Sequence, residues 1–136
     1  MELKTDFLAI KTSKRMEIVD ITRELNELIK SHKFKNGIIN VFTRHSTSAL
    51  AINENESGLV NDFQKTLEKL IPQNDNYQHD RIDNNADSHV RAFFIGGSES
   101  IPVSEGSMNL GTWQSVFFIE LDGPRNRKVV VTLMGN

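Results

Sequence analysis

The sequence predicts a single α+β domain, residues 1–136, built mostly on antiparallel sheet. At 136 residues the chain has the size of one ordinary domain, and a composition of 38% hydrophobic and 25% charged residues is that of a folded globular protein. Two amphipathic helical patterns are separated by short β-rich runs, and the last third of the chain is almost entirely β-rich. Elements in this order are typical of an α+β fold.

The N-terminal elements follow from two different hydrophobic periods. Residues 3–12 and 17–19 are β-like runs on either side of a Ser-Lys-Arg turn, and together they predict a hairpin. Asp20 is then placed to cap a helix that ends near residues 33–36. The apolar positions of this helix recur at i, i+4, i+7 and i+8: Ile21, Leu25, Leu28 and Ile29.

The middle of the chain is expected to hold two strands, a second helix and a loop. Residues 38–42 and 47–52 are β-rich, with His45 near their junction. The helix is predicted from apolar side chains at helical spacing: Leu59, Phe63, Leu67 and Leu70. Residues 72–80 begin with proline and are polar, which predicts a loop.

The C-terminal part of the chain is predicted to be a helical segment followed only by strands. Residues 86–95 have helical spacing, and the four strand-like runs after them are separated by glycines. The apolar run 129–131 shows no alternation, which predicts a strand covered on both faces. In so small a protein we expect another subunit to supply the second cover.

Composition and charge exclude several classes of function. The sequence has no cysteine, so it contains no disulfide, no cysteine-ligated zinc and no thiol nucleophile. A net charge of −2 gives no global basic field for nucleic acid. No window approaches the roughly 18 apolar residues of a membrane span, and the N-terminus lacks a signal-peptide pattern. We therefore expect a cytoplasmic protein with no nucleic-acid or membrane partner.

Three histidines are candidates for a metal or acid–base site. His45 shares a face with core residues if the preceding strand continues to it, so it is either a satisfied core histidine or a ligand. His89 shares a helix face with Asn85, while Asp83 lies just ahead of this helix and His79 lies in the loop that leads to it. Three converging imidazoles with an open fourth position would form a zinc site that lowers the pKa of bound water.

Two further charged stretches allow a structural or a functional interpretation. Glu120 lies in an apolar strand, on the same face as Gln114, where an unpaired carboxylate would be costly. It is either a strand-end residue that faces solvent or pairs with an arginine, or part of a site. Arg125, Arg127 and Lys128 follow a Gly-Pro turn, as the solvated charges of a hairpin turn or as a phosphate clamp.

Longer motifs resemble the YjbQ-like family, small uncharacterised proteins that are often labelled secondary thiamine-phosphate synthase enzymes. The resemblance covers nearly the whole chain through RHSTSALAINENE, YQHD, DNNADSHVRAFFIGGS and IPVSEGSMNLGTWQSVFFIELDGPRNRKVVVTLMG. Its most specific part is Leu-Gly-Thr-Trp-Gln followed by Glu-x-Asp-Gly-Pro-Arg. The chain departs from the family at Asn84, where a small residue is common, and at Phe93 and Phe94, which replace smaller residues.

The resemblance implies two mostly antiparallel sheets packed as a sandwich with two main helices, and assembly as a homotrimer. It also implies one pocket that gathers the family's recurring polar positions. In that pocket a divalent metal such as zinc would be held by His45, His79 and His89. The catalytic groups would be His45, Asp83, Asn85, Gln114 and Glu120, and the substrate would be bound by Thr112 and Arg125.

These features leave two hypotheses for the function. The first is a small-molecule enzyme that makes thiamine phosphate from an aminopyrimidine pyrophosphate and a thiazole phosphate, or that performs another metal-assisted reaction on a phosphorylated small molecule. The second is a non-catalytic trimer that binds a small phosphorylated or anionic metabolite in the same pocket. The sequence has no glycine-rich phosphate loop, which weakens the first hypothesis.

Overall fold

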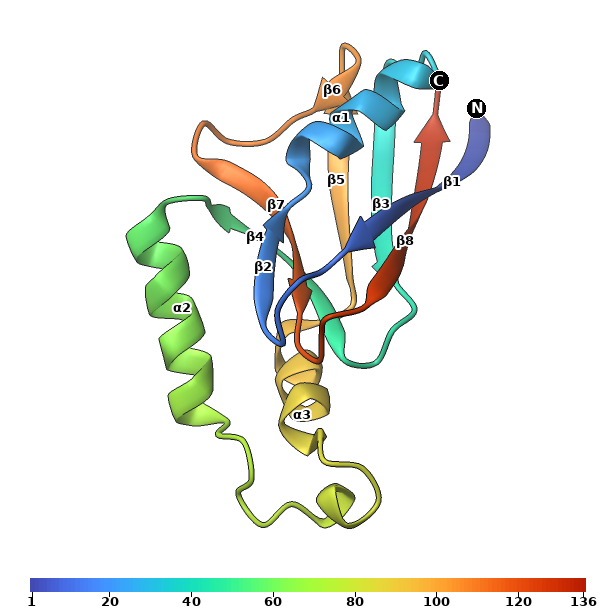
Figure 1. The fold of residues 1–136 in the computed structure, drawn as a ribbon. Coiled ribbons are helices and arrows are strands. Elements are labelled where there is room, and N and C mark those ends of the chain that lie inside the picture. The colour runs from blue at the N-terminus through green and yellow to red at the C-terminus, as the bar shows by residue number, and fades with distance from the viewer.

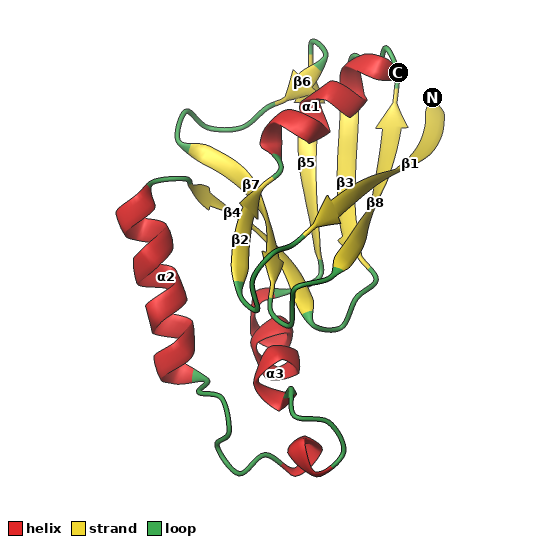
Figure 2. Cartoon of the chain, viewed as in Figure 1, coloured by secondary structure: helices red, strands yellow, loops and turns green.

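The computed structural model describes all 136 residues as eight strands, three α-helices and one short 3₁₀ helix (Figures 1 and 2). The strands are β1 Glu2–Lys11, β2 Glu17–Asp20, β3 Gly37–Thr43, β4 Ser48–Glu54, β5 Ser98–Ser104, β6 Ser107–Met108, β7 Gln114–Glu120 and β8 Asn126–Gly135. The helices are α1 Thr22–Ser31, α2 Ser57–Leu70 and α3 Ala86–Ile95, with the 3₁₀ helix η1 at Gln78–Arg81. All strand pairs are antiparallel, which confirms the predicted α+β class.

The strands form two separate sheets. The five-stranded sheet has the order β1-β8-β3-β5-β6 and the three-stranded sheet the order β2-β7-β4. Besides the two main helices, the helical segment predicted for residues 86–95 forms α3, which has ten residues, as many as α1. In Figure 1, α1 lies near both termini, whereas α3 lies at the opposite end of the strands.

The predicted hairpin of the first two strands is wrong. β1 pairs with β8 in the five-stranded sheet, and β2 pairs with β7 in the three-stranded sheet. The successive strands β3 and β4, and β7 and β8, are divided between the sheets in the same way. The physical reason is that successive apolar strands bury their side chains face to face across a sandwich core, so they need not pair edge to edge.

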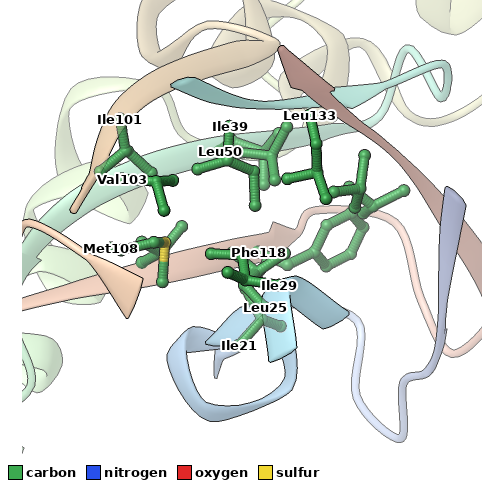
Figure 3. Packing of buried hydrophobic residues seen from close by; sticks show 14 of the residues in the cluster. Ile21, Leu25, Ile29, Ile39, Leu50, Ile101, Val103, Met108, Phe118 and Leu133 are labelled. Atoms are coloured by element: carbon green, nitrogen blue, oxygen red, sulfur yellow. The ribbon is translucent and has the colours of Figure 1, made fainter. Parts of the chain in front are cut away.

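The main core lies between the two sheets and α1 (Figure 3). Ile39 and Val41 of β3 face Leu50 of β4 and Phe118 of β7, and all four are fully buried. The amphipathic stripe of α1 closes this core, as its apolar spacing predicted.

A second, smaller core covers the other face of the three-stranded sheet. It joins Phe117 and Ile119 of β7 to Leu67 of α2, with Ala92 and Ile95 of α3 packed against them. The strand covered on both faces is therefore β7, in which every residue from 116 to 120 is buried.

Strand β8 alternates in burial within the single chain, so the second cover predicted for residues 129–131 would have to come from another subunit. Val129 and Val131 are fully buried, whereas Val130 is only partly buried on the outer face of the five-stranded sheet. Within one chain nothing covers this outer face, whereas both faces of β7 are covered by the same chain. No helix in the protein is long and apolar enough to cross a membrane.

Candidate functional site

A pocket of about 340 Å³ lies between the link from β3 to β4 and helix α3. One wall is the segment just after β3, and the opposite wall is the face of α3 that carries His89. Six of the ten lining residues are polar, namely Thr43, Arg44, His45, Ser46, Ser48 and His89, and the others are Phe42, Ala92, Phe93 and Gly97. The pocket thus brings together two of the three predicted histidines, from segments far apart in the sequence.

His45 is held in a defined orientation at the edge of this pocket. Its Nε2 accepts a hydrogen bond from the backbone N–H of Lys128 in β8, at 3.2 Å. Burial and the nearby positive charge of Arg127 lower the pKa of His45 below its ordinary value, so the ring is neutral at pH 7. A neutral ring whose Nε2 is an acceptor carries its proton on Nδ1, which leaves no free lone pair in this arrangement.

His79 and His89 contact one another beside the pocket. Their ring centroids lie 4.8 Å apart in an edge-to-face arrangement with an interplanar angle of 74°. Asn85, the N-cap residue of α3, lies next to them, and its Oδ1 is 3.0 Å from Nε2 of His79. The prediction that Asn85 and His89 lie on one side of this helix agrees with these contacts.

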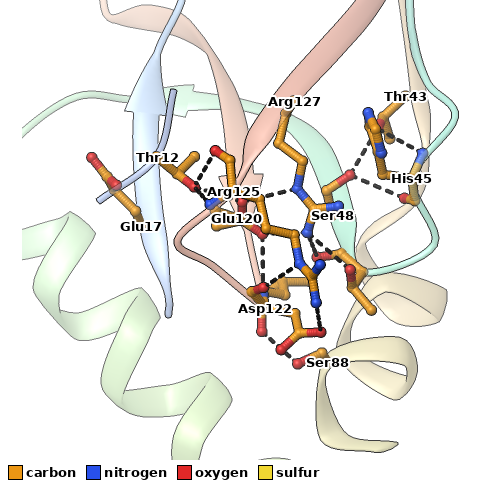
Figure 4. Close-up of polar contacts among 12 residues, drawn as sticks. Thr12, Glu17, Thr43, His45, Ser48, Ser88, Glu120, Asp122, Arg125 and Arg127 are labelled. Atoms are coloured by element: carbon orange, nitrogen blue, oxygen red, sulfur yellow. Dashed lines mark hydrogen bonds and ion pairs between the residues drawn. The ribbon is translucent and has the colours of Figure 1, made fainter. Parts of the chain in front are cut away.

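Asn85 also contacts the segment that links β7 to β8. Its Nδ2 donates to Oδ2 of Asp122 at 2.9 Å, and Arg125 donates to the same oxygen at 3.1 Å. Arg125 is additionally bound to the Asp122 carbonyl through Nε at 2.7 Å. Figure 4 shows this link approaching α3 at Ser88, whose hydroxyl donates to the carbonyl of Leu121. The Asp-Gly-Pro-Arg segment therefore supports the histidine pair.

Glu120 has the partner that its position in an apolar strand required. Its side chain is fully buried and accepts hydrogen bonds from Arg127 and from the hydroxyl of Thr12 at 2.8 Å (Figure 4). Burial raises the pKa of Glu120, but the bonds from Arg127 and Thr12 outweigh it, so the pKa lies below its ordinary value. Arg127 is buried as well, so its interpretation as a solvated turn charge is wrong.

The other predicted site residues lie outside this cluster in the single chain. Asp83 is exposed, and only its backbone is hydrogen bonded to the loop. Thr112 and Gln114 are exposed near the start of β7, and the side chain of Gln114 only accepts a hydrogen bond from the N–H of Gly111. Gln114 and Glu120 are the two ends of β7, six residue steps apart, which corresponds to about 20 Å.

The predicted three-histidine metal centre does not form within one chain. No three histidine, aspartate or glutamate side chains lie close enough to share a metal ion. His79 and His89 are adjacent, but His45 uses its Nε2 for the Lys128 amide. One chain thus offers two neighbouring imidazoles, those of His79 and His89, as metal ligands. A third protein ligand would be available only if His45 rearranged or if another copy of the chain supplied a residue.

Two residues of the cluster were missed by the sequence analysis. Arg44 lines the pocket and forms no ion pair, but one arginine beside a histidine carries no sequence signal of its own. Asp122 was available within the Glu-x-Asp-Gly-Pro-Arg motif, yet its contact with Asn85 joins positions 37 residues apart in the sequence. Only the fold reveals that contact.

The fold and this cluster define a class of small α+β domains with two sheets and a histidine-containing pocket at one end. The family model described as "UPF0047 protein YjbQ-like" matches residues 6–136. The chain therefore belongs to the UPF0047/YjbQ-like family, which confirms the resemblance seen in its motifs.

Individual relatives support this assignment. A UPF0047 protein of Methanothermobacter thermautotrophicus is 54% identical over 99% of this chain and 94% of its own. The UPF0047 protein YugU of Bacillus subtilis is 34% identical over 98% and 99% of the two chains. The crystal structure of a YbjQ-like protein of unknown function from Sulfolobus solfataricus matches with a TM-score of 0.95 at 36% identity, covering 99% of both chains. A hypothetical protein from Aeropyrum pernix matches with a TM-score of 0.94 at 34% identity, over 98% of this chain and 99% of its own.

Proposed function

We propose that the protein is an enzyme that acts on a small phosphorylated molecule in the pocket between Arg44 and His89. The observation that carries this proposal is the convergence of Arg44, His45 and His89 on one open pocket. Arg44 forms no ion pair with another side chain, so its guanidinium is available to an anionic oxygen, for which its planar donors are well suited.

The two sides of the pocket suit different tasks. On one side, Arg44 and the neutral His45 offer hydrogen-bond donors to a phosphate or to a leaving group on which charge develops. On the other side, His89 makes no side-chain hydrogen bond to the protein and contacts His79 through its ring. In the absence of a bound metal, His89 is therefore our candidate for proton transfer, because imidazole is the side chain most often used as a general acid or base.

A divalent metal, zinc above all, is our proposal for the cofactor of this pocket. His79 and His89 are the first candidate ligands because their rings are in contact, and imidazole nitrogens are common zinc ligands. Such an ion would supply Lewis acidity toward a phosphoryl oxygen. Asn85 acts in this proposal as a supporting group beside the histidine pair, whereas Asp83 and Glu120 lie outside the pocket in one chain.

Thiamine-phosphate synthesis is the specific reaction to test first, on the strength of the family resemblance. Thr112 and Arg125 were expected to bind that substrate and Gln114 to act in catalysis, but in one chain they lie away from the pocket, near the start of β7 or against Asp122. A homotrimer, in which another copy brings such residues to the pocket, is part of this proposal.

The outer face of the five-stranded sheet is the surface that we propose for this assembly. The pairing places Phe7, Val130 and Phe42 in one row across three strands, and Leu3, Met134 and Ile38 in another. Five of these six side chains are among the exposed large hydrophobic residues of the protein. Phe42 also lines the pocket, so a copy that covers this face would lie beside the site.

The experiment pairs anion binding with turnover. Binding of inorganic pyrophosphate is measured by calorimetry for the wild type, for Arg44→Gln and for the control Arg23→Gln, which changes an exposed arginine of α1. Loss of one charge-assisted contact should weaken binding by roughly tenfold to a hundredfold in Arg44→Gln only. Pyrophosphate release from the aminopyrimidine and thiazole substrates is then measured with the same proteins.

The outcomes separate the two hypotheses for the function. Turnover that is lost in Arg44→Gln and kept in Arg23→Gln supports an enzyme of this specificity. Pyrophosphate binding without turnover of any phosphorylated substrate tested would instead favour the non-catalytic binder. Absence of binding, or equal binding by both variants, would overturn the proposed pocket.

A further inference from the structure

A continuous path of side-chain hydrogen bonds leads from the link between β7 and β8 to the histidine pair. It runs through Arg125, Asp122, Asn85 and His79. Its distances are 3.1 Å, 2.9 Å and 3.0 Å in that order. Asn85 is only 7% exposed and the side chain of Asp122 is 16% exposed, so water competes little for the bond between them, whereas Arg125 and His79 at the two ends of the path are exposed. Nothing in the sequence around His79 indicates this path.

The path fixes the orientation of the Asn85 amide. A carboxylate only accepts hydrogen bonds, so the group of Asn85 that meets Oδ2 of Asp122 must be the donating NH₂. The amide is planar, and its oxygen therefore points the other way, toward Nε2 of His79. Asp122 thus decides which end of the Asn85 amide the histidine meets.

The orientation of Asn85 in turn selects the protonated nitrogen of His79. The Asn85 oxygen is an acceptor only, so the 3.0 Å contact is a hydrogen bond only when Nε2 of His79 carries the proton. In the neutral ring the lone pair then lies on Nδ1. Histidines that bind metals or transfer protons are commonly oriented by such a bond on their other nitrogen.

We propose that Asp122 is a positioning residue which, through Asn85, holds His79 with its proton on Nε2 and leaves Nδ1 as the atom that meets a substrate proton or a metal. The inference deepens the proposed function and depends on it for its biological meaning. The arrangement itself is a property of the ligand-free protein, so it is measured without any substrate.

The test is the protonation state of the two nitrogens of His79, read from long-range ¹H–¹⁵N spectra of the ¹⁵N-labelled protein treated with a chelator. The signals of His79 are assigned by their absence from His79→Gln. In the wild type we expect Nδ1 at the shift of an unprotonated nitrogen and Nε2 at that of a protonated one. The opposite pattern, or an even mixture, would overturn the inference.

Asp122→Asn isolates the role of the carboxylate. An amide at position 122 donates as well as accepts, so the Asn85 amide loses its fixed orientation and the proton of His79 should redistribute toward Nδ1. Asp75→Asn is the control, since Asp75 is an exposed carboxylate in the loop between α2 and η1, near His79 in the sequence, and has no side-chain hydrogen bond. An unchanged His79 pattern in a folded Asp122→Asn protein would overturn the inference, and a shift in Asp75→Asn equal to that in Asp122→Asn would do the same.

The readout distinguishes this inference from the proposed function. The expected pattern in a protein that binds no pyrophosphate would leave the inference standing and remove the proposed function. Pyrophosphate binding by a protein whose His79 carries its proton on Nδ1 would do the reverse. If Asp122→Asn does not fold, the wild-type spectrum alone still shows whether the proton of His79 lies on Nε2, as the inference requires.

Discussion

Glu120 and Arg127 form a buried ion pair that joins β7 of the three-stranded sheet to β8 of the five-stranded sheet. Both side chains are at most 5% exposed, and Arg127 uses both Nε and Nη2 to bind the two carboxylate oxygens. Removing one partner leaves an uncompensated charge in the interior, which typically costs about 3–5 kcal/mol. We therefore expect Arg127→Met to lower the free energy of unfolding by about this amount in urea denaturation.

Two further variants make this prediction specific. The double variant Glu120→Gln with Arg127→Met should recover much of the loss, because no unpaired charge is then buried. Arg125→Met removes an arginine from an ion pair in which it is 53% exposed, and should change stability by no more than about 1 kcal/mol. Equal losses of unfolding free energy in Arg127→Met and Arg125→Met would contradict the conclusion that the buried Glu120–Arg127 pair contributes more to stability than the exposed Asp122–Arg125 pair.

The same carboxylate predicts how stability depends on pH. The folded-state pKa of Glu120 lies below its ordinary value of 4.5, because bonds from Arg127 and Thr12 outweigh the effect of burial. A lowered pKa contributes stability above the unfolded value, and this contribution is lost as the pH falls toward the folded value. The stability difference between the wild type and Glu120→Gln should therefore shrink as the pH drops below about 4.5. A difference that stays constant or widens with acidification would contradict the assignment.

The sequence predicted the helices well because their signals are local. The apolar spacings of α1, α2 and α3 each describe one element, so each helix lies where its spacing predicted. The stripe of α1 is buried as expected, whereas Leu59 and Leu70 of α2 and Phe93 and Phe94 of α3 remain exposed. The pairing of strands is not local, so the adjacency of β1 and β2 suggested a hairpin that does not exist. Runs of valine and phenylalanine likewise indicate that a strand is apolar, but they do not indicate which helix or sheet packs against it.

The candidate site was predictable in its residue types and unpredictable in its contacts. His45, His79 and His89 stood out as polar residues beside apolar runs, and the structure places them near one another. The hydrogen bond that occupies Nε2 of His45 comes from a backbone amide 83 residues away. A backbone donor has no sequence signal. Only the fold therefore shows that His45 is bound to a backbone amide while His79 and His89 contact one another.

Metal analysis tests the role of the histidine pair. We expect near-stoichiometric zinc or another transition metal by plasma mass spectrometry of protein purified without a histidine tag. This content should fall sharply in His79→Ala and His89→Ala, and less in His45→Ala, whose Nε2 is bound to the Lys128 amide. His32→Ala is the control, because His32 pairs with Asp6 at the end of α1. Background metal in a folded wild-type protein would remove the metal from the proposal.

The outer face of the five-stranded sheet predicts a change in assembly when it is charged. Phe7 and Phe42 flank Val130 in one row, and both phenylalanines are nearly half exposed in the single chain. A contiguous apolar surface of this kind marks an interaction site, and burying a carboxylate in it would be costly.

We expect sedimentation of the wild type at three times the 15.4 kDa of one chain, and a shift toward the monomer in Phe42→Asp. Leu70→Asp, which changes an exposed apolar residue at the end of α2, should leave the mass unchanged. Binding of pyrophosphate measured on the same samples then shows whether the pocket needs its neighbour: binding that is lost with the trimer places part of the site on a second copy. A monomeric wild type at the highest concentration used, or a trimer that survives Phe42→Asp, would show that this face is not the contact between copies.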